Sequence, residues 1–293
     1  MPATLIFPLE IPVQASTIKG KYRLKEKVEM MARLLSLLII CFLGVASLPL
    51  PCRAEPTFPL RAEYPDVRPI SIKALDRLYG SATIVDVRAK LEYDVIHMSQ
   101  AINIPVAHAS FESQLEERRS QIGNDPLVFY CNGFDCAKAY EAAKKAMTLG
   151  FPNVYAYDAG IENWVVAHPE KTTLMGESPA RKERLISGST LARHTIGYAE
   201  FKRRAERPKA AVIDIREPVQ RKDIPPFSKV RNIPTDLFIQ SLNSGEFRND
   251  ELLIFDAVGR QVVWLQYYLE KYRYRNYYFL RNGASGARKG GGR

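Results

Sequence analysis

Short apolar runs alternate with amphipathic segments along most of the chain. Ile84–Val87 and Leu127–Tyr130 are rich in β-branched or aromatic residues, as strands buried on both faces require. Ala137–Leu149 places its alanines on one helical face, and Gly150 follows as a stop signal. A strand, helix, strand order predicts right-handed crossovers, and therefore a parallel sheet with helices on both faces.

The same plan occurs twice along the chain, about 125 residues apart. Four pairs of segments match in the same order: Ile84–Arg88 with Val212–Arg216, Asn103–Pro105 with Asn232–Pro234, Leu127–Cys131 with Leu252–Asp256, and Phe151–Gly160 with Tyr274–Gly283. A length of 293 residues agrees with two domains of roughly 150 residues each. The sequence therefore predicts two α/β domains in tandem.

The beginning of the chain has the features of a secretory signal peptide. Residues Leu34–Leu50 are almost wholly apolar, follow Arg33 and lead to a small-residue exit at Cys52–Ala54. This pattern predicts export, to the bacterial periplasm. The alternative is an uncleaved anchor facing the periplasm, because about 17 apolar residues is near the lower limit for a membrane span. A further hypothesis is that residues 1–29 are a misassigned start, with translation beginning at Met30 or Met31.

Composition narrows the class of protein. Hydrophobic residues make up 46% and charged residues 25%, which is ordinary for a globular protein and excludes disorder and a polytopic membrane protein. The net charge of +10 comes without a dense Lys/Arg run, so no nucleic-acid partner is expected. Four cysteines are too few for a disulfide scaffold, and the four histidines show no metal spacing. No metal and no cofactor is predicted.

Cys131 is the strongest candidate for chemistry. It follows a predicted strand, where ligands bind in open α/β sheets, and a short glycine-containing loop leads from it to Cys136 and a helix. Loop N–H groups and the positive end of that helix would favour the thiolate, which is the nucleophilic form. After signal removal only these two cysteines remain, and export would place both in an oxidising compartment.

At these residues the chain resembles the tandem form of the rhodanese (thiosulfate sulfurtransferase) superfamily. The resemblance covers Ser71–Pro169 and, more weakly, Thr190–Gly286. The motifs that carry it are Asp86-Val87-Arg88, Ile96–Ala101 before Asn103–Pro105, the loop Cys131–Cys136, and Gly160–Trp164. The resemblance implies two doubly wound domains, each with a five-stranded parallel sheet. It also implies that Cys131 takes sulfane sulfur from a donor such as thiosulfate as a persulfide. The persulfide would then pass this sulfur to a thiol or cyanide acceptor.

Two departures from the family pattern matter. Family loops commonly end in an arginine that holds an anionic donor, and here that place is Cys136. The second copy has Asp256 in place of the nucleophile, so the second domain is predicted to be inactive, because a carboxylate cannot form a persulfide. A phosphatase of the Cys-x5-Arg kind is excluded, since Ala137 stands where its arginine would be.

Cys136 and the other loop residues leave alternatives open. Cys136 is either a resolving thiol that closes a disulfide with Cys131 or a small residue tolerated at a helix start, and a bridge needs Cα atoms within about 7 Å. Asn132, Gly133, Phe134, Asp135 and Ala137 complete the predicted active-site loop. Phe134 and Asp135 either select the donor or are simply exposed. Asp86 and Arg88 either brace the loop base or contact substrate.

Three functions therefore compete. The leading prediction is a sulfurtransferase, the second a thiol–disulfide redox protein with a redox partner, and the third a non-catalytic rhodanese-like binding module. No membrane partner is expected unless the signal is uncleaved. The predicted division is 1–54 signal region, 55–70 linker, 71–170 catalytic domain 1, 171–189 linker, 190–286 inactive domain 2, and 287–293 disordered tail.

Overall fold

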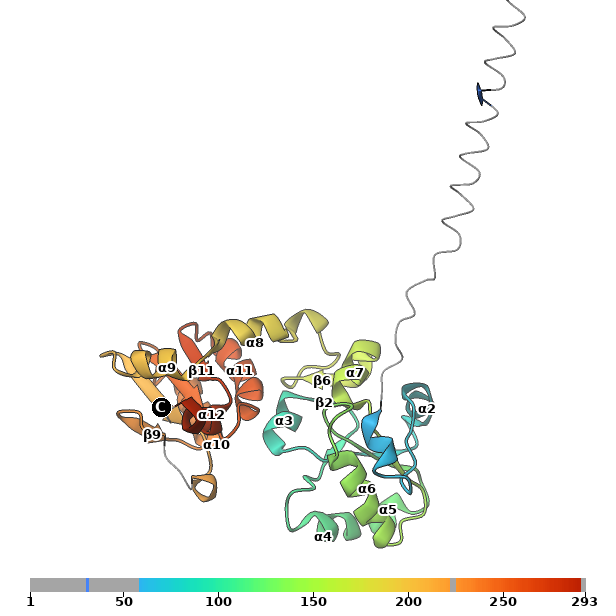
Figure 1. The fold of residues 1–293 in the computed structure, drawn as a ribbon. Coiled ribbons are helices and arrows are strands. Elements are labelled where there is room, and N and C mark those ends of the chain that lie inside the picture. Colours follow the sequence, from blue (N-terminus) through green and yellow to red (C-terminus); the bar gives the residue numbers. More distant parts are fainter. Residues whose placement is uncertain (1–29, 32–57, 222–224, 291–293) are drawn as a thin grey trace, which may run out of the picture. The chain divides into compact units, whose positions relative to one another are not determined.

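The structure is a computed structural model that describes residues 30–31, 58–221 and 225–290. The predicted signal region, residues 1–54, lies outside the described residues except for Met30 and Met31. Within the described ranges, no helix combines the length and the apolar character needed to span a bilayer. Figure 1 shows the described elements in chain order.

The first sheet is parallel and has the strand order β3-β1-β4-β5 within the described residues. Its strands are β1 (Thr83–Asp86), β3 (Ile102–Asn103), β4 (Leu127–Tyr130) and β5 (Val154–Tyr157). Beyond β5, Pro69 forms a parallel bridge with Ala156, and Ile70 N donates to Ala156 O. The fifth strand that the resemblance implied is therefore reduced to a short bridged segment at the sheet edge.

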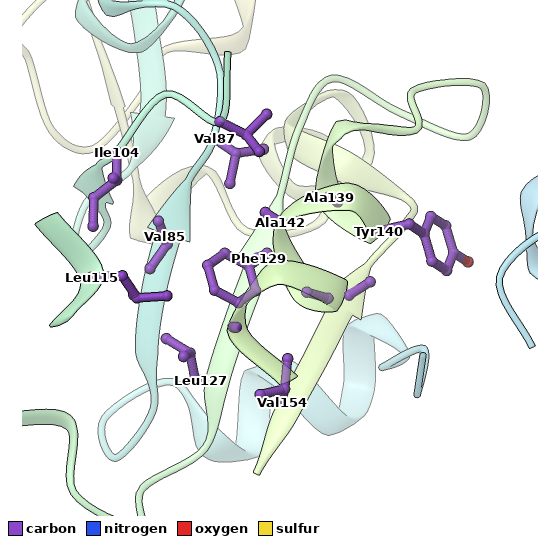
Figure 2. Packing of buried hydrophobic residues seen from close by; sticks show 14 of the residues in the cluster. Val85, Val87, Ile104, Leu115, Leu127, Phe129, Ala139, Tyr140, Ala142 and Val154 are labelled. Atoms are coloured by element: carbon purple, nitrogen blue, oxygen red, sulfur yellow. The ribbon is translucent and has the colours of Figure 1, made fainter. Parts of the chain in front are cut away.

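Alternate strand residues of this sheet face two separate helical layers. Val85, Leu127 and Phe129 pack on one face, mainly against the alanines of α6, and Figure 2 shows these side chains gathered between the strands and that helix. Ile84 and Val128 pack on the opposite face. The first layer holds α4 (Phe111–Glu116), α5 (Arg119–Ile122) and α6 (Lys138–Thr148); the second holds α2 (Ile72–Leu78), α3 (Lys90–Val95) and α7 (Gly160–Ala167).

The second sheet repeats the strand order of the first. Its order is β7-β11-β10-β8-β9, and all of its described strand pairs are parallel. The strands are β7 (Thr195–Ile196), β8 (Ala210–Asp214), β9 (Val230–Asn232), β10 (Glu251–Phe255) and β11 (Tyr277–Leu280). One face packs on α10 (Thr235–Ser244) and α11 (Gln261–Lys271), and the other on α9 (Tyr198–Ala205) and α12 (Gly283–Gly290). The predicted α/β class with helix-covered parallel sheets is confirmed.

Both predicted linkers contain ordered segments that pack on the first sheet or its helices. In 55–70, Val67 and Ile70 are buried in the two cores. In 171–189, β6 (Thr172–Leu174) pairs antiparallel with β2 (Ile96–Met98), and Leu174 is buried. The linker predictions are wrong for these residues, because alternating apolar side chains and free strand edges draw the segments onto the domain. The same stretches hold η1 (Pro59–Ala62), η2 (Pro169–Lys171), η3 (Lys182–Arg184) and the start of α8 (Gly188–His194).

The predicted disordered tail is also wrong for residues 287–290. Helix α12 continues through Gly290, and its Ala284 and Ala287 are buried beside Phe201 and Leu280. Small side chains three residues apart lie on one helical face, so they let the helix pack closely on the sheet. The remaining described element is η4 (Pro218–Gln220), which follows β8.

Candidate functional site

The candidate site is the loop that joins β4 to α6. Cys131 directly follows the last residue of β4, and α6 begins at Lys138 with Ala137 as its N-cap. The neighbouring strand β1 ends at Asp86, which pairs in register with Tyr130. The structure therefore brings the predicted loop and the Asp86-Val87-Arg88 motif to the same carboxyl edge of the sheet.

The two loop cysteines are joined by a disulfide. The Cα atoms of Cys131 and Cys136 are 6.4 Å apart, inside the range that a bridge requires. Cys131 is fully buried, whereas Cys136 is only partly buried at the edge of the same apolar cluster. The Sγ atom of Cys131 also lies 3.1 Å from the carbonyl oxygen of Cys136. The geometric condition for a resolving thiol is met.

The loop N–H groups that were expected to surround the Cys131 sulfur do not donate to it in the disulfide state. No backbone N–H of the described residues donates a hydrogen bond to this Sγ. The Cys136 amide donates instead to Gly133 O, which closes a turn inside the loop. The reason is chemical: a disulfide sulfur is uncharged, so it is a weak acceptor for N–H groups.

At the equivalent place in the second sheet, four backbone N–H groups surround the side chain of Asp256, and we call this set of donors the amide cup. Its Oδ1 accepts N–H bonds from Val258 (3.0 Å) and Gly259, and its Oδ2 accepts from Gln261 and Val262 (3.2 Å). Asp256 is 2% exposed, so this carboxylate is removed from water and bound by backbone donors. Two of those donors belong to the first turn of α11, whose positive end favours an anion.

Arg88 and Asp86 form a buried pair at the base of the Cys131 loop. The Arg88 Nε and Nη2 atoms donate to the Asp86 carboxylate, at 2.9 Å and 2.6 Å, and both side chains are fully buried. Burial opposes the charge of the guanidinium, but Asp86 outweighs it and raises the pKa of Arg88. The same pair recurs at Asp214 and Arg216 in the second sheet.

Arg88 also reaches the loop itself. Its Nη1 donates to Asn132 Oδ1 at 3.0 Å, and Asn132 Nδ2 donates to Glu92 Oε1 at 2.9 Å. The residue that follows Cys131 is thus held from both ends of its amide. Arg88 Nη2 also donates to the carbonyl oxygen of Ile96. These bonds are the ones that an Arg88 side chain bracing the base of the loop requires.

Gly160 lies against the loop at the start of α7. Its φ is +66°, and a Cβ at this position would lie 2.2 Å from Asn132 O. The next two amides, of Ile161 and Glu162, donate to the carbonyls of Cys131 and Asn132. Gly283 has the same relation to Asp256, with φ +54° and a Cβ that would lie 2.5 Å from Asp256 O. The sequence match between these glycines therefore reflects a shared close approach of backbone to backbone.

The outer part of the loop is acidic and aromatic. Asp135 is exposed, and Phe134 packs edge-on against Phe58 with ring centroids 5.0 Å apart. Glu162 lies beside Gly133, whose Cβ would be 3.5 Å from Glu162 Oε2. Burial raises the pKa of Glu162, and the charge of Asp135 raises it further. Sequence reasoning did not identify Glu162 as part of the site, because its helix lies outside the loop.

Within residues 30–31, 58–221 and 225–290, no group of three or more His, Cys, Asp or Glu side chains is placed to hold a metal ion.

A family model for the rhodanese-like domain matches residues 71–167. This chain contains a rhodanese-like domain. The thiosulfate:glutathione sulfurtransferase of Saccharomyces cerevisiae is 28% identical over 121 residues, which are 37% of this chain and 86% of the yeast protein. The family match and this relative support a sulfurtransferase-like domain.

Other relatives differ in how much of their own length this chain covers. An HTH-type transcriptional regulator of Mycobacterium tuberculosis is 36% identical over 89 residues, and the match spans 36% of the regulator and 30% of this chain. A human single-domain sulfurtransferase structure has 25% identity and a TM-score of 0.29, covering 34% of this chain and 96% of its own. The thiosulfate sulfurtransferase of Pseudomonas aeruginosa has 18% identity and a TM-score of 0.31, covering 75% of this chain and 44% of its own.

Proposed function

We propose that this protein is a sulfurtransferase in which Cys131 carries sulfane sulfur as a persulfide. The observation that carries the proposal is a cysteine at the carboxyl end of β4, opening the loop to α6 in a rhodanese-like domain. The donor is thiosulfate or a related sulfane compound, and the acceptor is a thiol or cyanide. The first domain performs the chemistry.

The reaction has two displacement steps. The Cys131 thiolate attacks the outer sulfur of thiosulfate, the S–S bond of the donor breaks, and sulfite leaves with the bonding electron pair. A nucleophilic acceptor then attacks the outer sulfur of the persulfide, and the Cys131 thiolate leaves. Negative charge stays on sulfur in both steps, so the loop amides and the N-terminal end of α6 stabilise it. The Cys131–Cys136 disulfide must first be opened by two thiol equivalents, which become a disulfide themselves.

We further propose that the second sheet belongs to an inactive rhodanese-like copy. The shared strand order, the Asp214–Arg216 pair and the position of Gly283 support a common origin of the two halves. Asp256 stands where the nucleophile would be and cannot carry sulfur.

The disulfide favours a second candidate, a thiol–disulfide function of the Cys131–Cys136 pair. In this scheme the Cys136 thiolate attacks Cys131 Sγ of the persulfide, the bond to the outer sulfur breaks, and hydrosulfide leaves. The resulting disulfide would be reduced by two thiols of a redox partner. The oxidising environment of the proposed periplasmic location would keep such a pair as a disulfide.

The test uses the reduced full chain with thiosulfate and cyanide, and measures thiocyanate. Wild type is expected to turn over, Cys131→Ser to be inactive, and Cys136→Ser, which changes the matching loop cysteine in the same way, to remain active. Intact mass after thiosulfate alone should show the gain of one sulfur atom on wild type and Cys136→Ser only. Turnover by Cys131→Ser would overturn the proposal. Hydrosulfide release from wild type that is lost in Cys136→Ser would favour the redox pair.

A further inference from the structure

A tryptophan of the second domain covers the arginine that braces the catalytic loop. The Arg88 guanidinium lies 5.5 Å from the ring centroid of Trp264, which belongs to α11. Trp264 is half-buried, and with Tyr267 and Tyr268 it packs on the apolar cluster of the first domain. A ring face at this distance attracts a guanidinium, more strongly where water is excluded.

The position of Arg88 decides where Asn132 lies. Arg88 donates to Asp86, to Ile96 O and to Asn132 Oδ1, and is fully buried. Of these bonds, only the one to Asn132 reaches the loop that holds Cys131. Water admitted at the guanidinium would compete for that bond, because an exposed donor is satisfied by solvent.

Helix α11 is fixed at its beginning by Asp256. The Gln261 and Val262 amides, in the first turn of α11, donate to the Asp256 carboxylate. Trp264 follows within that same turn. A continuous set of contacts therefore runs from the amide cup of the second domain, through Trp264, to Arg88.

We propose that Trp264 is a positioning residue for sulfur transfer at Cys131. Its ring keeps water from the Arg88–Asn132 hydrogen bond and so fixes the residue next to the nucleophile. The inference rests on the proposed sulfurtransferase function, and it gives the second domain a part in the reaction although that domain has no nucleophile.

The experiment compares Trp264→Ala, Trp264→Phe and Tyr268→Ala in the full chain. Tyr268 lies on the same helix and packs on the same cluster, so it is the matched control for lost packing. Two quantities are measured: kcat and KM with thiosulfate and cyanide, and amide hydrogen exchange of residues 131–137 in the reduced protein. We expect Trp264→Ala to lower kcat by about tenfold with little change in KM, because small displacements of reacting groups are costly. Exchange in the loop should become faster.

Trp264→Phe retains a ring face over the guanidinium and should recover most of kcat and of the slow exchange. Tyr268→Ala should leave both near wild type. Equal effects of Trp264→Ala and Tyr268→Ala on kcat and on loop exchange would overturn the proposal, as would a failure of Trp264→Phe to recover either. If wild type transfers no sulfur, the proposed function fails, and the exchange comparison still decides whether Trp264 fixes the loop. Should Trp264→Ala not fold, Trp264→Leu replaces it in the same comparison.

Discussion

The loops that begin at Cys131 and Asp256 occupy the same place in two sheets of the same strand order, but they hold their first side chain differently. Around Asp256, four backbone amides converge on a buried carboxylate. Around Cys131, the sulfur is bound to Cys136 and no described amide donates to it. The difference agrees with the chemistry of the two acceptors, because a carboxylate is a strong acceptor for N–H groups and a disulfide sulfur is a weak one.

The second loop thus holds a carboxylate, and the first would hold a thiolate only after reduction of the disulfide. Four experiments test this contrast, beginning with the largest expected effect.

Replacing the Asp256 carboxylate should cause the greatest loss of stability. We expect Asp256→Ala to lower the free energy of unfolding by about 3–5 kcal/mol, because buried amides lose a charged acceptor. The measurement is urea unfolding with reductant present. The control is Asp135→Ala, an exposed aspartate in the first loop, which should change the value by less than about 0.5 kcal/mol. A loss at Asp256 no greater than that of the control would show that the amide cup contributes nothing.

The two close-approach glycines should both be intolerant of a side chain but differ in their effect on activity. Gly160→Ala and Gly283→Ala each force a Cβ into a backbone carbonyl at positive φ, and each should cost about 2–4 kcal/mol. Gly160→Ala should also abolish most thiocyanate formation, because it displaces α7 from the Cys131 loop. Gly150→Ala is the control: its φ is +84° with nothing within 4 Å, so it isolates the backbone strain. A similar cost at all three glycines would contradict the close approach.

Reduction should weaken the first loop and leave the second unchanged. A six-residue disulfide loop stabilises a fold by about 2 kcal/mol on the chain-entropy estimate. Unfolding of wild type should therefore shift by that amount between oxidising and reducing conditions. The double variant Cys131→Ser with Cys136→Ser should show no such shift. A shift of the same size in the double variant would mean that reductant acts elsewhere.

The smallest effect concerns donor charge at the loop entrance. Glu162 is negative above its raised pKa and repels thiosulfate, so the KM for thiosulfate should fall as the pH drops through that pKa. Glu162→Gln should have a KM about two- to threefold lower at neutral pH and should lose this pH dependence. Glu141→Gln, on the exposed part of α6, is the charge-matched control. An unchanged KM in Glu162→Gln would remove Glu162 from donor selection.

The sequence predicted those parts of the fold that depend on local pattern. Strand β4 has the predicted bounds, and α6 ends within one residue of its predicted end, because apolar runs and a glycine stop are local signals. The match of Gly160 with Gly283 was visible in the sequence, and the structure gives its physical cause in the clash that a Cβ would make.

What the sequence could not give depends on contacts between distant segments. The sequence predicts a linker at Thr172–Leu174, because three residues among polar neighbours show no periodicity. They form strand β6 through their pairing with β2. The position of Trp264 over Arg88 carries no sequence signal, because it depends on a contact between residues 176 positions apart. The sequence predicts loop amides around the Cys131 sulfur, but in the structure this sulfur is bound to Cys136 and no described amide donates to it.

The antiparallel β2–β6 pair has a consequence for where this polypeptide can be cut. The family match ends at residue 167, but Thr172–Leu174 supplies the backbone partner of Ile96–Met98. A fragment that stops at the family boundary would expose a bare strand beside the buried Met98, and unpaired edges of this kind invite association between molecules. The smallest fragment that keeps β2 paired with β6 therefore extends beyond Leu174.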